Sequence, residues 1–334
     1  MIRCSGQRQT ISILYESSTV SVVSVSMLKA IRIPKKYRGI VLFLRDAGIA
    51  FLFVCLVLLM MFAFTGLWPP LVVVESNSMM HGDENLSHIG AIDTGDLVLV
   101  KKVDQVADVE TYLEGYVSGH RSYGDYGDVI VYERGGLATA TPIIHRAMIY
   151  LEINPGNISY TCVALKNVPQ TKWSTVNTAD TWDNLTSILV IQDVGWNGLS
   201  VTVDIHTMLS SHRSGFITKG DHNSAIDQMY GPAGPVDIDW VVGKARGEIP
   251  WFGLLKLWST DTLGSPAPPN SVRNLWISIA VIVIAPVLMD IFLTYREKKR
   301  VERRRALRGI ESDKTPGSEK RVESEERKKP PNRS

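Results

Sequence analysis

Four polar side chains spread along the sequence are candidates for cutting a peptide bond. Ser78 could act as a nucleophile and His145 as its base, and Asp221 and Asp227 could orient the imidazole. A serine hydroxyl is a weak nucleophile near neutral pH until a base accepts its proton, and imidazole suits that role. A carboxylate bonded to the other ring nitrogen holds the ring and stabilises the imidazolium. The choice between the two acids stays open, because only folding can unite residues this far apart.

Each candidate also has a purely structural interpretation. An isolated serine such as Ser78 is most often a polar turn residue. His145 in PIIHRAM is typical of a half-buried histidine whose ring nitrogens have hydrogen-bond partners. Asp221 in TKGDHN favours a turn, and Asp227 in SAIDQ a helix cap or a surface acid. Taken singly, none of them indicates catalysis.

Composition argues against several other chemistries. The sequence contains neither CxxC nor HExxH, and its seven histidines show no metal-ligand spacing, so we predict no metal and no cofactor. Three cysteines are too few for a disulfide framework. A net charge of +2 and a pI of about 8.3 carry no overall signal for nucleic acid, and we predict no nucleic-acid partner.

Two apolar segments are long enough to cross a lipid bilayer as helices. Residues 49–68 carry no charge, and residues 275–294 are of similar length but include Pro286 and Asp290. Basic residues precede the first segment and follow the second, as YREKKRVERRRALR, so both termini are predicted to be cytoplasmic. The sequence therefore predicts a multi-pass protein of the cell membrane whose residues 69–270 lie outside the cytoplasm.

The chain before the first apolar segment and the chain after the second are predicted to be cytoplasmic. Residues 1–48 form an N-terminal segment in which Met27 is an alternative start to Met1. Residues 295–334 are basic, rich in Glu, Ser and Pro toward the end, and predicted to be disordered, because they cannot bury enough apolar surface.

The external region is predicted to be mainly β. Residues 95–103, 127–134, 141–153 and 187–195 are short runs rich in Val, Ile and Tyr that follow turn residues. Residues 154–215 are richer in Asn, Thr, Ser and Gly, and we interpret them as an elaboration on the core sheet. Trp68 and the apolar residues of 251–258 could rest at the lipid interface, the alternative for 251–258 being a helix buried against the sheet.

Five short boxes resemble those of type I signal peptidases, in the branch found in archaea and the endoplasmic reticulum. They are ESNSMM, GDLVLVKK, GDVIVYE, PIIHRAM and FITKGDHNSAID, and they follow the first apolar segment in that order. The resemblance implies a membrane-bound serine peptidase with a coiled antiparallel β-sheet domain, which removes signal peptides from exported preproteins. The implied partners are those preproteins and the lipid bilayer, and the protein-export machinery stays open as a further one.

The resemblance also implies roles for individual residues. Ser78 is the implied nucleophile, His145 stands where the bacterial branch has a lysine base, and Asp221 and Asp227 are acids near this dyad. The resemblance to the bacterial branch implies that the Ser76 hydroxyl and the Ser78 amide form the oxyanion hole. We favour Asp227 as the residue that orients His145.

The sequence departs from the family pattern at one position and leaves two alternatives open. Where the family usually has a proline, this chain has His81, a rival base close to Ser78. A Ser/Lys dyad using Lys101 or Lys102, with Lys219 as a further candidate, is a second arrangement for catalysis. A membrane-tethered β-rich binding module without catalysis is the non-enzymatic alternative.

Overall fold

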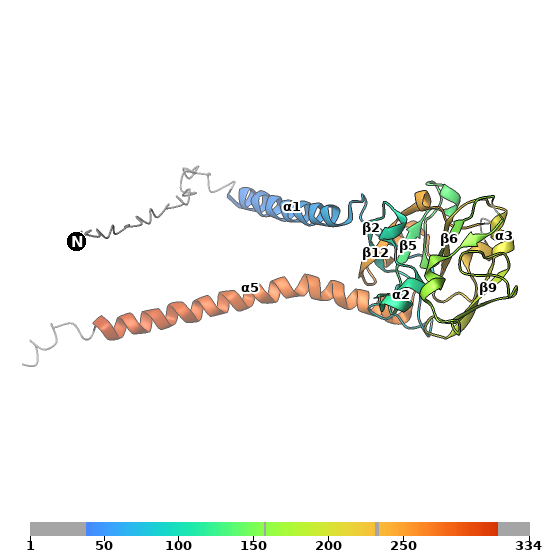
Figure 1. The fold of residues 1–334 in the computed structure, drawn as a ribbon. Helices are drawn as coiled ribbons and strands as arrows, with labels where there is room; N and C mark the ends of the chain where they lie inside the picture. The colour runs from blue at the N-terminus through green and yellow to red at the C-terminus, as the bar shows by residue number, and fades with distance from the viewer. Residues whose placement is uncertain (1–37, 157, 231–233, 313–334) are drawn as a thin grey trace, which may run out of the picture. The chain divides into compact units, whose positions relative to one another are not determined.

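The structure, a computed structural model, describes residues 38–156, 158–230 and 234–312 (Figure 1). The chain divides into two units, Met1–Leu59 and Met60–Ser334, and the described part of the first unit is the leading part of a long helix. All strands that the structure describes belong to the second unit. The alternative start at Met27 lies outside the described residues.

Helices and strands alternate irregularly along the chain. In order they are α1 (Arg38–Thr65), β1 (Leu71–Val73), β2 (Leu97–Lys102), η2 (Val106–Asp108), α2 (Tyr112–Ser118), β3 (Arg121–Ser122), β4 (Asp125–Tyr126), β5 (Val129–Tyr132), η3 (Arg134–Gly136), β6 (Ile143–Ile153), β7 (Tyr160–Thr161), η4 (Val163–Asn167), β8 (Trp173–Thr175), β9 (Ile188–Val194), β10 (Leu199–Asp204), α3 (Ile205–Leu209), β11 (Gly215–Lys219), η5 (Asp227–Met229), η6 (Ile238–Trp240), β12 (Val241–Ile249), α4 (Leu254–Thr260) and α5 (Pro269–Ser312). The strands expected from the sequence are confirmed as β2, β5, β6 and β9.

A seven-stranded antiparallel sheet forms the centre of the second unit. Its strand order is β1-β2-β12-β5-β6-β11, and β7 pairs with β6. Strand β6 lies between β5 and β11, with His145 opposite Ile130 of β5 and Arg146 opposite Lys219 of β11. Because successive side chains of a strand point to opposite faces, His145 and Arg146 face opposite sides of the sheet.

The stretch 154–215 adds a second, smaller sheet. Its strands are ordered β10-β9-β8 and pair in antiparallel fashion. Alternate residues of β9 and β10 are buried, and Leu189, Ile191 and Val201 belong to one apolar cluster with Leu151 of β6. The elaboration predicted from the sequence therefore packs its apolar face against the strand that carries His145.

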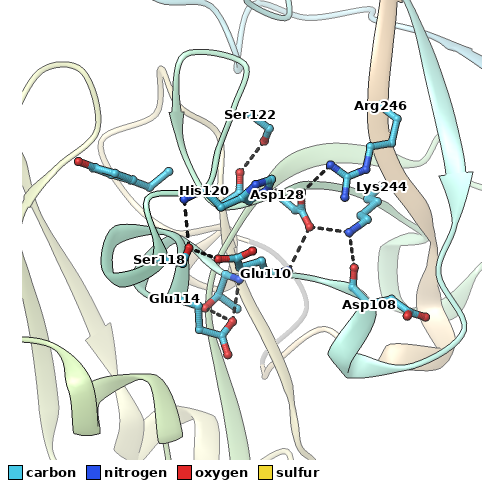
Figure 2. A network of polar contacts seen from close by, with 12 residues as sticks. Asp108, Glu110, Glu114, Ser118, His120, Ser122, Asp128, Lys244 and Arg246 are labelled. Carbon is cyan, nitrogen blue, oxygen red and sulfur yellow. Dashed lines mark hydrogen bonds and ion pairs between the residues drawn. The ribbon is translucent and has the colours of Figure 1, made fainter.

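A buried carboxylate fixes β5 in place. Asp128, fully buried just before β5, receives hydrogen bonds from Lys244 Nζ of β12 at 2.8 Å and from the Glu110 amide at 3.1 Å (Figure 2). His120 Nε2 lies 2.9 Å from its other oxygen, and Arg246 Nη1 lies 3.5 Å from it. Burial by itself would raise the pKa of Asp128, but the Lys244 hydrogen bond and its other donors hold that pKa below the usual range. The charged Asp128 thereby ties β5, β12 and the segment before α2 together.

Within the described part of the chain, two helices are long and apolar enough to cross a membrane. The segments that qualify are Gly39–Thr65 in α1 and Pro269–Arg304 in α5, and the apolar part of each is exposed. The expectation of antiparallel sheets between two long apolar helices is therefore confirmed. The chain as a whole combines long helices with antiparallel sheets.

Both long helices extend beyond the segments predicted from the sequence. Helix α1 already begins at Arg38, and α5 starts at Pro269, contains Pro286 and ends at Ser312. Residues 295–312, which we expected to be disordered, are helical. The expectation was wrong because it considered only the lack of apolar residues, whereas Lys, Arg, Glu, Ala and Leu all favour a helix. The rest of the predicted tail, 313–334, lies outside the described residues.

The stretch 251–258 contains the short helix α4. Its Leu254 and Leu257 are fully buried and share an apolar cluster with Leu275 of α5, whereas Leu255 and Trp258 are 44% and 42% exposed. One side of α4 therefore packs inward, as the alternative interpretation predicted, while its other side keeps apolar residues exposed.

Candidate active site

A tight turn between β1 and β2 carries Ser78. The Met80 amide donates to the Asn77 carbonyl at 3.1 Å, which closes the turn around the serine. The next two side chains, Met79 and Met80, are almost fully buried, at 1% and 0% exposure. Ser78 itself is half-buried and lines a cleft. The two methionines therefore anchor the turn in the core and leave the hydroxyl of Ser78 at the surface of the cleft.

The Ser78 hydroxyl lies within hydrogen-bond distance of His145. Its Oγ is 2.8 Å from Nε2 of the imidazole, although 67 positions separate the two residues in the sequence. His145 is 9% exposed and is held on β6 between two neighbouring strands. A side chain on a central strand is held more firmly than one on a loop, which suits a group that must receive a proton at a fixed position.

The second ring nitrogen of His145 contacts Asp227. His145 Nδ1 lies 2.6 Å from Asp227 Oδ2, and the same oxygen accepts hydrogen bonds from Tyr132 Oη at 2.8 Å and Thr218 Oγ1 at 2.7 Å. With Nδ1 donating to the carboxylate, Nε2 is the nitrogen that accepts the Ser78 proton. Ser78, His145 and Asp227 therefore form one continuous chain of hydrogen bonds.

The environment of Asp227 keeps this residue ionised. Burial alone would raise its pKa, but the hydrogen bond and charge of His145, together with Thr218 and Tyr132, leave the pKa of Asp227 below its usual value. A carboxylate in this state can accept the Nδ1 proton in a hydrogen bond and stabilise an imidazolium. Tyr132 responds in the opposite direction, since burial and the neighbouring Asp227 charge raise the pKa of its phenol.

Asp221 has different partners. Its two oxygens receive Arg146 Nε at 2.8 Å and Arg146 Nη2 at 2.6 Å, and both side chains are almost fully buried. Burial would raise the pKa of Asp221, but the Arg146 charge and hydrogen bonds hold it well below the usual range. The sequence left open which of the two acids contacts His145. In the structure Asp227 is hydrogen-bonded to His145, whereas Asp221 pairs with Arg146.

Ser76 lies beside the nucleophile candidate. Its Oγ is 3.2 Å from Ser78 Oγ, and both serines line the same cleft. An oxyanion that develops near Ser78 Oγ would thus lie within reach of the Ser76 hydroxyl, which can rotate to donate. This placement fits the role that the resemblance implied for Ser76.

The rival bases have other contacts. Lys101 and Lys102 are exposed at the end of β2, and Lys102 pairs with Asp104. Lys219 is buried, but its Nζ donates to the carbonyls of Gly220 at 3.0 Å and Asp221 at 3.3 Å. Among the residues that the structure describes, Ser76 and His145 are the side chains that hydrogen-bond the Ser78 hydroxyl.

A cleft of about 550 Å³ runs over these residues. Ser76, Ser78, His145 and Asp227 line it together with apolar side chains, among them Val73, Met79, Ile143, Ile144 and Trp240. Its walls come from the end of β1, the start of β6 and the segment around η5. A cleft with this mixture of apolar walls and a polar centre suits a short peptide segment whose backbone must reach the Ser78 hydroxyl.

Sequence reasoning missed two residues of the site, Tyr132 and Thr218. Both hydrogen-bond Asp227 and thereby support the chain that leads to Ser78. Each lies in a box already singled out, Tyr132 in GDVIVYE and Thr218 in FITKGDHNSAID. A tyrosine and a threonine at the ends of buried strands are common, however, and nothing in their spacing connects them with residue 227.

Comparison with known proteins gives no family for this chain. No protein-family model matches the sequence, and no curated protein matches it significantly. What the site can do chemically therefore has to follow from its geometry. A search of residues 38–156, 158–230 and 234–312 finds no group of three or more His, Cys, Asp or Glu able to hold a metal ion.

Proposed function

We propose that this protein is a membrane-bound serine endopeptidase that cleaves signal peptides from exported preproteins. The observation that carries the proposal is the hydrogen-bond chain from Ser78 Oγ through His145 to Asp227, with contacts of 2.8 and 2.6 Å. Serine, histidine and aspartate in this order are the groups that acyl transfer needs, whatever the fold that supports them. The order of the five boxes that resemble type I signal peptidases agrees with it, and that family's mainly β, coiled antiparallel domain belongs to the same proposal.

The geometry supports a conventional acyl-enzyme mechanism. Ser78 Oγ attacks the carbonyl carbon of the scissile bond while His145 Nε2 takes its proton, and the Asp227 carboxylate stabilises the resulting imidazolium. The Ser76 hydroxyl and the Ser78 amide stabilise the oxyanion. His145 then passes the proton to the leaving amine as the C–N bond breaks. Water, deprotonated by His145, then attacks the acyl carbon; the bond from that carbon to Ser78 Oγ breaks, and His145 returns the proton to Ser78 Oγ.

The placement of Ser78 after an apolar helix supports the choice of substrate. Ser78 follows Trp68 by ten residues, and a fully extended linker of that length reaches about 35 Å at most. A signal peptide has its apolar segment in the bilayer and its cleavage site just beyond it. A nucleophile tethered to the end of a membrane span therefore meets such a site without a long search.

The location of the protein follows from the same proposal. Residues 69–270 lie on the extracytoplasmic side of the cell membrane, and both termini are cytoplasmic because both apolar helices have basic residues on the side away from this domain. Exposed Leu255 and Trp258 on α4 are available to contact lipid at the interface. Preproteins and the bilayer are the proposed partners, with the export machinery as a further candidate.

Incubation of the detergent-solubilised full chain with a preprotein tests the proposed function. We expect two fragments, the mature protein and the signal peptide, because the cleft presents a single nucleophile to the segment beyond the apolar stretch. Mass spectrometry of both fragments should place the cut at one bond. A preprotein that stays at full length while bound to this protein would support the tethered binding module instead.

Replacement of Ser76 by alanine should slow cleavage without abolishing it. One donor to the oxyanion would be lost, which typically lowers kcat by about 10²- to 10³-fold, or about 2.7 to 4 kcal/mol in barrier height. KM should change little, because the donor acts mainly in the transition state. Steady-state kinetics on a peptide substrate measures both constants, with exposed Ser200→Ala as the matched control. An unchanged kcat in Ser76→Ala would exclude Ser76 from the oxyanion hole.

A further inference from the structure

His81 lies three residues after Ser78 and makes a contact that links two distant parts of the chain. Its Nε2 lies 2.8 Å from Oδ2 of Asp221, across 140 positions of sequence. The His81 side chain is 17% exposed and that of Asp221 only 4%. His81 therefore hydrogen-bonds Asp221 in the FITKGDHNSAID box, whereas the Ser78 hydroxyl is hydrogen-bonded to His145.

The acceptor of His81 is itself fixed firmly. Asp221 receives two hydrogen bonds from Arg146, whose side chain is 1% exposed. Arg146 Nη1 also donates to the backbone carbonyls of Ser122 at 3.1 Å and Tyr126 at 3.0 Å. A buried ion pair with further hydrogen bonds is a rigid point, because moving either charge would leave the other unpaired in the interior.

The segment 76–81, here named the nucleophile segment, contacts the FITKGDHNSAID box at a second place. The His222 amide donates to the Ser78 carbonyl at 2.9 Å. Gly220 lies so close that a Cβ there would be 2.6 Å from the Ser78 carbonyl oxygen and 2.9 Å from His145 Nε2. The bonds at His81 and at Ser78 thus close a ring between the nucleophile segment and residues 221–222, and small shifts of that segment would change the Ser78–His145 distance.

The His81 ring is also enclosed on two sides. It stacks on Trp196, with ring centroids 6.1 Å apart and an angle of 27° between the planes. On another side it meets Gly124, where a Cβ would come within 3.1 Å of the imidazole. Trp196 belongs to the turn between β9 and β10, so the elaboration 154–215 contributes directly to this contact.

We propose that His81 is a positioning residue, which holds the nucleophile segment against Asp221 so that Ser78 Oγ stays in reach of His145. The inference rests on the proposed function. A proline at this position, as in the family that the boxes resemble, would restrict the backbone locally. In this chain a tertiary hydrogen bond to a buried ion pair restricts the segment instead, and Trp196 stacks on the ring that makes this bond.

Two substitutions at residue 81 separate the hydrogen bond from the ring packing. His81→Phe keeps an aromatic ring between Trp196 and Gly124 but has no donor for Asp221. His81→Gln loses the ring but retains an N–H that can reach the carboxylate. The residues that line the cleft do not include His81, so substrate binding should be the same in both variants.

Steady-state kinetics of the full chain on a signal-peptide substrate tests the inference. We expect His81→Phe to lower kcat by about 10- to 100-fold with KM nearly unchanged, since a displacement of about 1 Å in a reacting group has costs of this order. His81→Gln should recover most of the lost kcat. The exposed His206→Ala is the matched control and should behave as the unsubstituted protein. Thermal melting checks that the variants fold alike.

The outcomes separate this inference from the proposed function. A wild-type kcat in His81→Phe would overturn the positioning role while leaving the peptidase intact. Equal losses in His81→Phe and His81→Gln would also overturn it, because the donor would then be irrelevant. If the unsubstituted protein itself cleaves no preprotein, the proposed function fails, and the inference that rests on it fails with it.

Discussion

A Ser78→Ala variant should leave a preprotein uncut under conditions in which the unsubstituted protein cleaves it completely. The substitution removes Ser78 Oγ, the oxygen that lies 2.8 Å from His145 Nε2 and would attack the carbonyl carbon. Loss of the nucleophile in a serine peptidase lowers kcat by roughly 10⁶-fold. Gel electrophoresis or mass spectrometry of the preprotein measures this as the disappearance of both products.

The fold should survive this substitution, which makes the result interpretable. Ser78 is half-buried, and Met79 and Met80 anchor its turn in the core independently of the hydroxyl. The melting temperature of Ser78→Ala should therefore stay close to that of the exposed control Ser200→Ala. Cleavage by Ser78→Ala at even a tenth of the normal rate would remove Ser78 from the mechanism and with it the proposed function.

A His145→Ala variant is expected to lose almost as much activity. Without the imidazole, nothing accepts the Ser78 proton, and the leaving amine has no donor. We expect kcat to fall by roughly 10⁴- to 10⁶-fold, because nucleophile and base act as one unit. Single-turnover assays with excess enzyme extend the measurable range. Asp227 would lose its ring partner but keep Tyr132 and Thr218, so the fold around it should persist.

Lys101→Ala, assayed in parallel, tests whether Lys101 or His145 is the base. Lys101 is exposed, and its Nζ lies 5.8 Å from the centre of the Phe64 ring, so its ammonium is not desolvated as a lysine base would require. The Lys101→Ala variant should cleave at the normal rate. The reverse result, an active His145→Ala and a silent Lys101→Ala, would establish the Ser/Lys alternative.

Much of the fold could be predicted because it depends on local patterns. Apolar runs of about 20 residues predict helices long enough to cross a membrane, and apolar β-branched runs between turns predict strands such as β5 and β6. The end of α5 was missed for an equally local reason. Charged residues such as those at 295–312 can continue a helix that has already formed, because most of them have a good intrinsic helix propensity.

The candidate site could be predicted only in part. The types and order of Ser78, His145, Asp221 and Asp227 indicated the chemistry, but their spacing could not say which acid meets the histidine. The structure places Asp227 there and gives Asp221 to Arg146. Tyr132 and Thr218 were missed because each is an ordinary strand residue until the fold brings it to Asp227.

By itself, the sequence determined where the chain is apolar, where it forms strands and which reactive side chains it carries, since these depend on residues near one another. Only the tertiary structure decided which of these side chains hydrogen-bond one another. The register of β6 between β5 and β11 directs His145 to one face of the sheet and Arg146 to the other, and so assigns one acid to each. The contact of His81 with Asp221 likewise depends on packing across 140 residues. Pairings over such distances are set by how whole sheets pack, which no local pattern encodes.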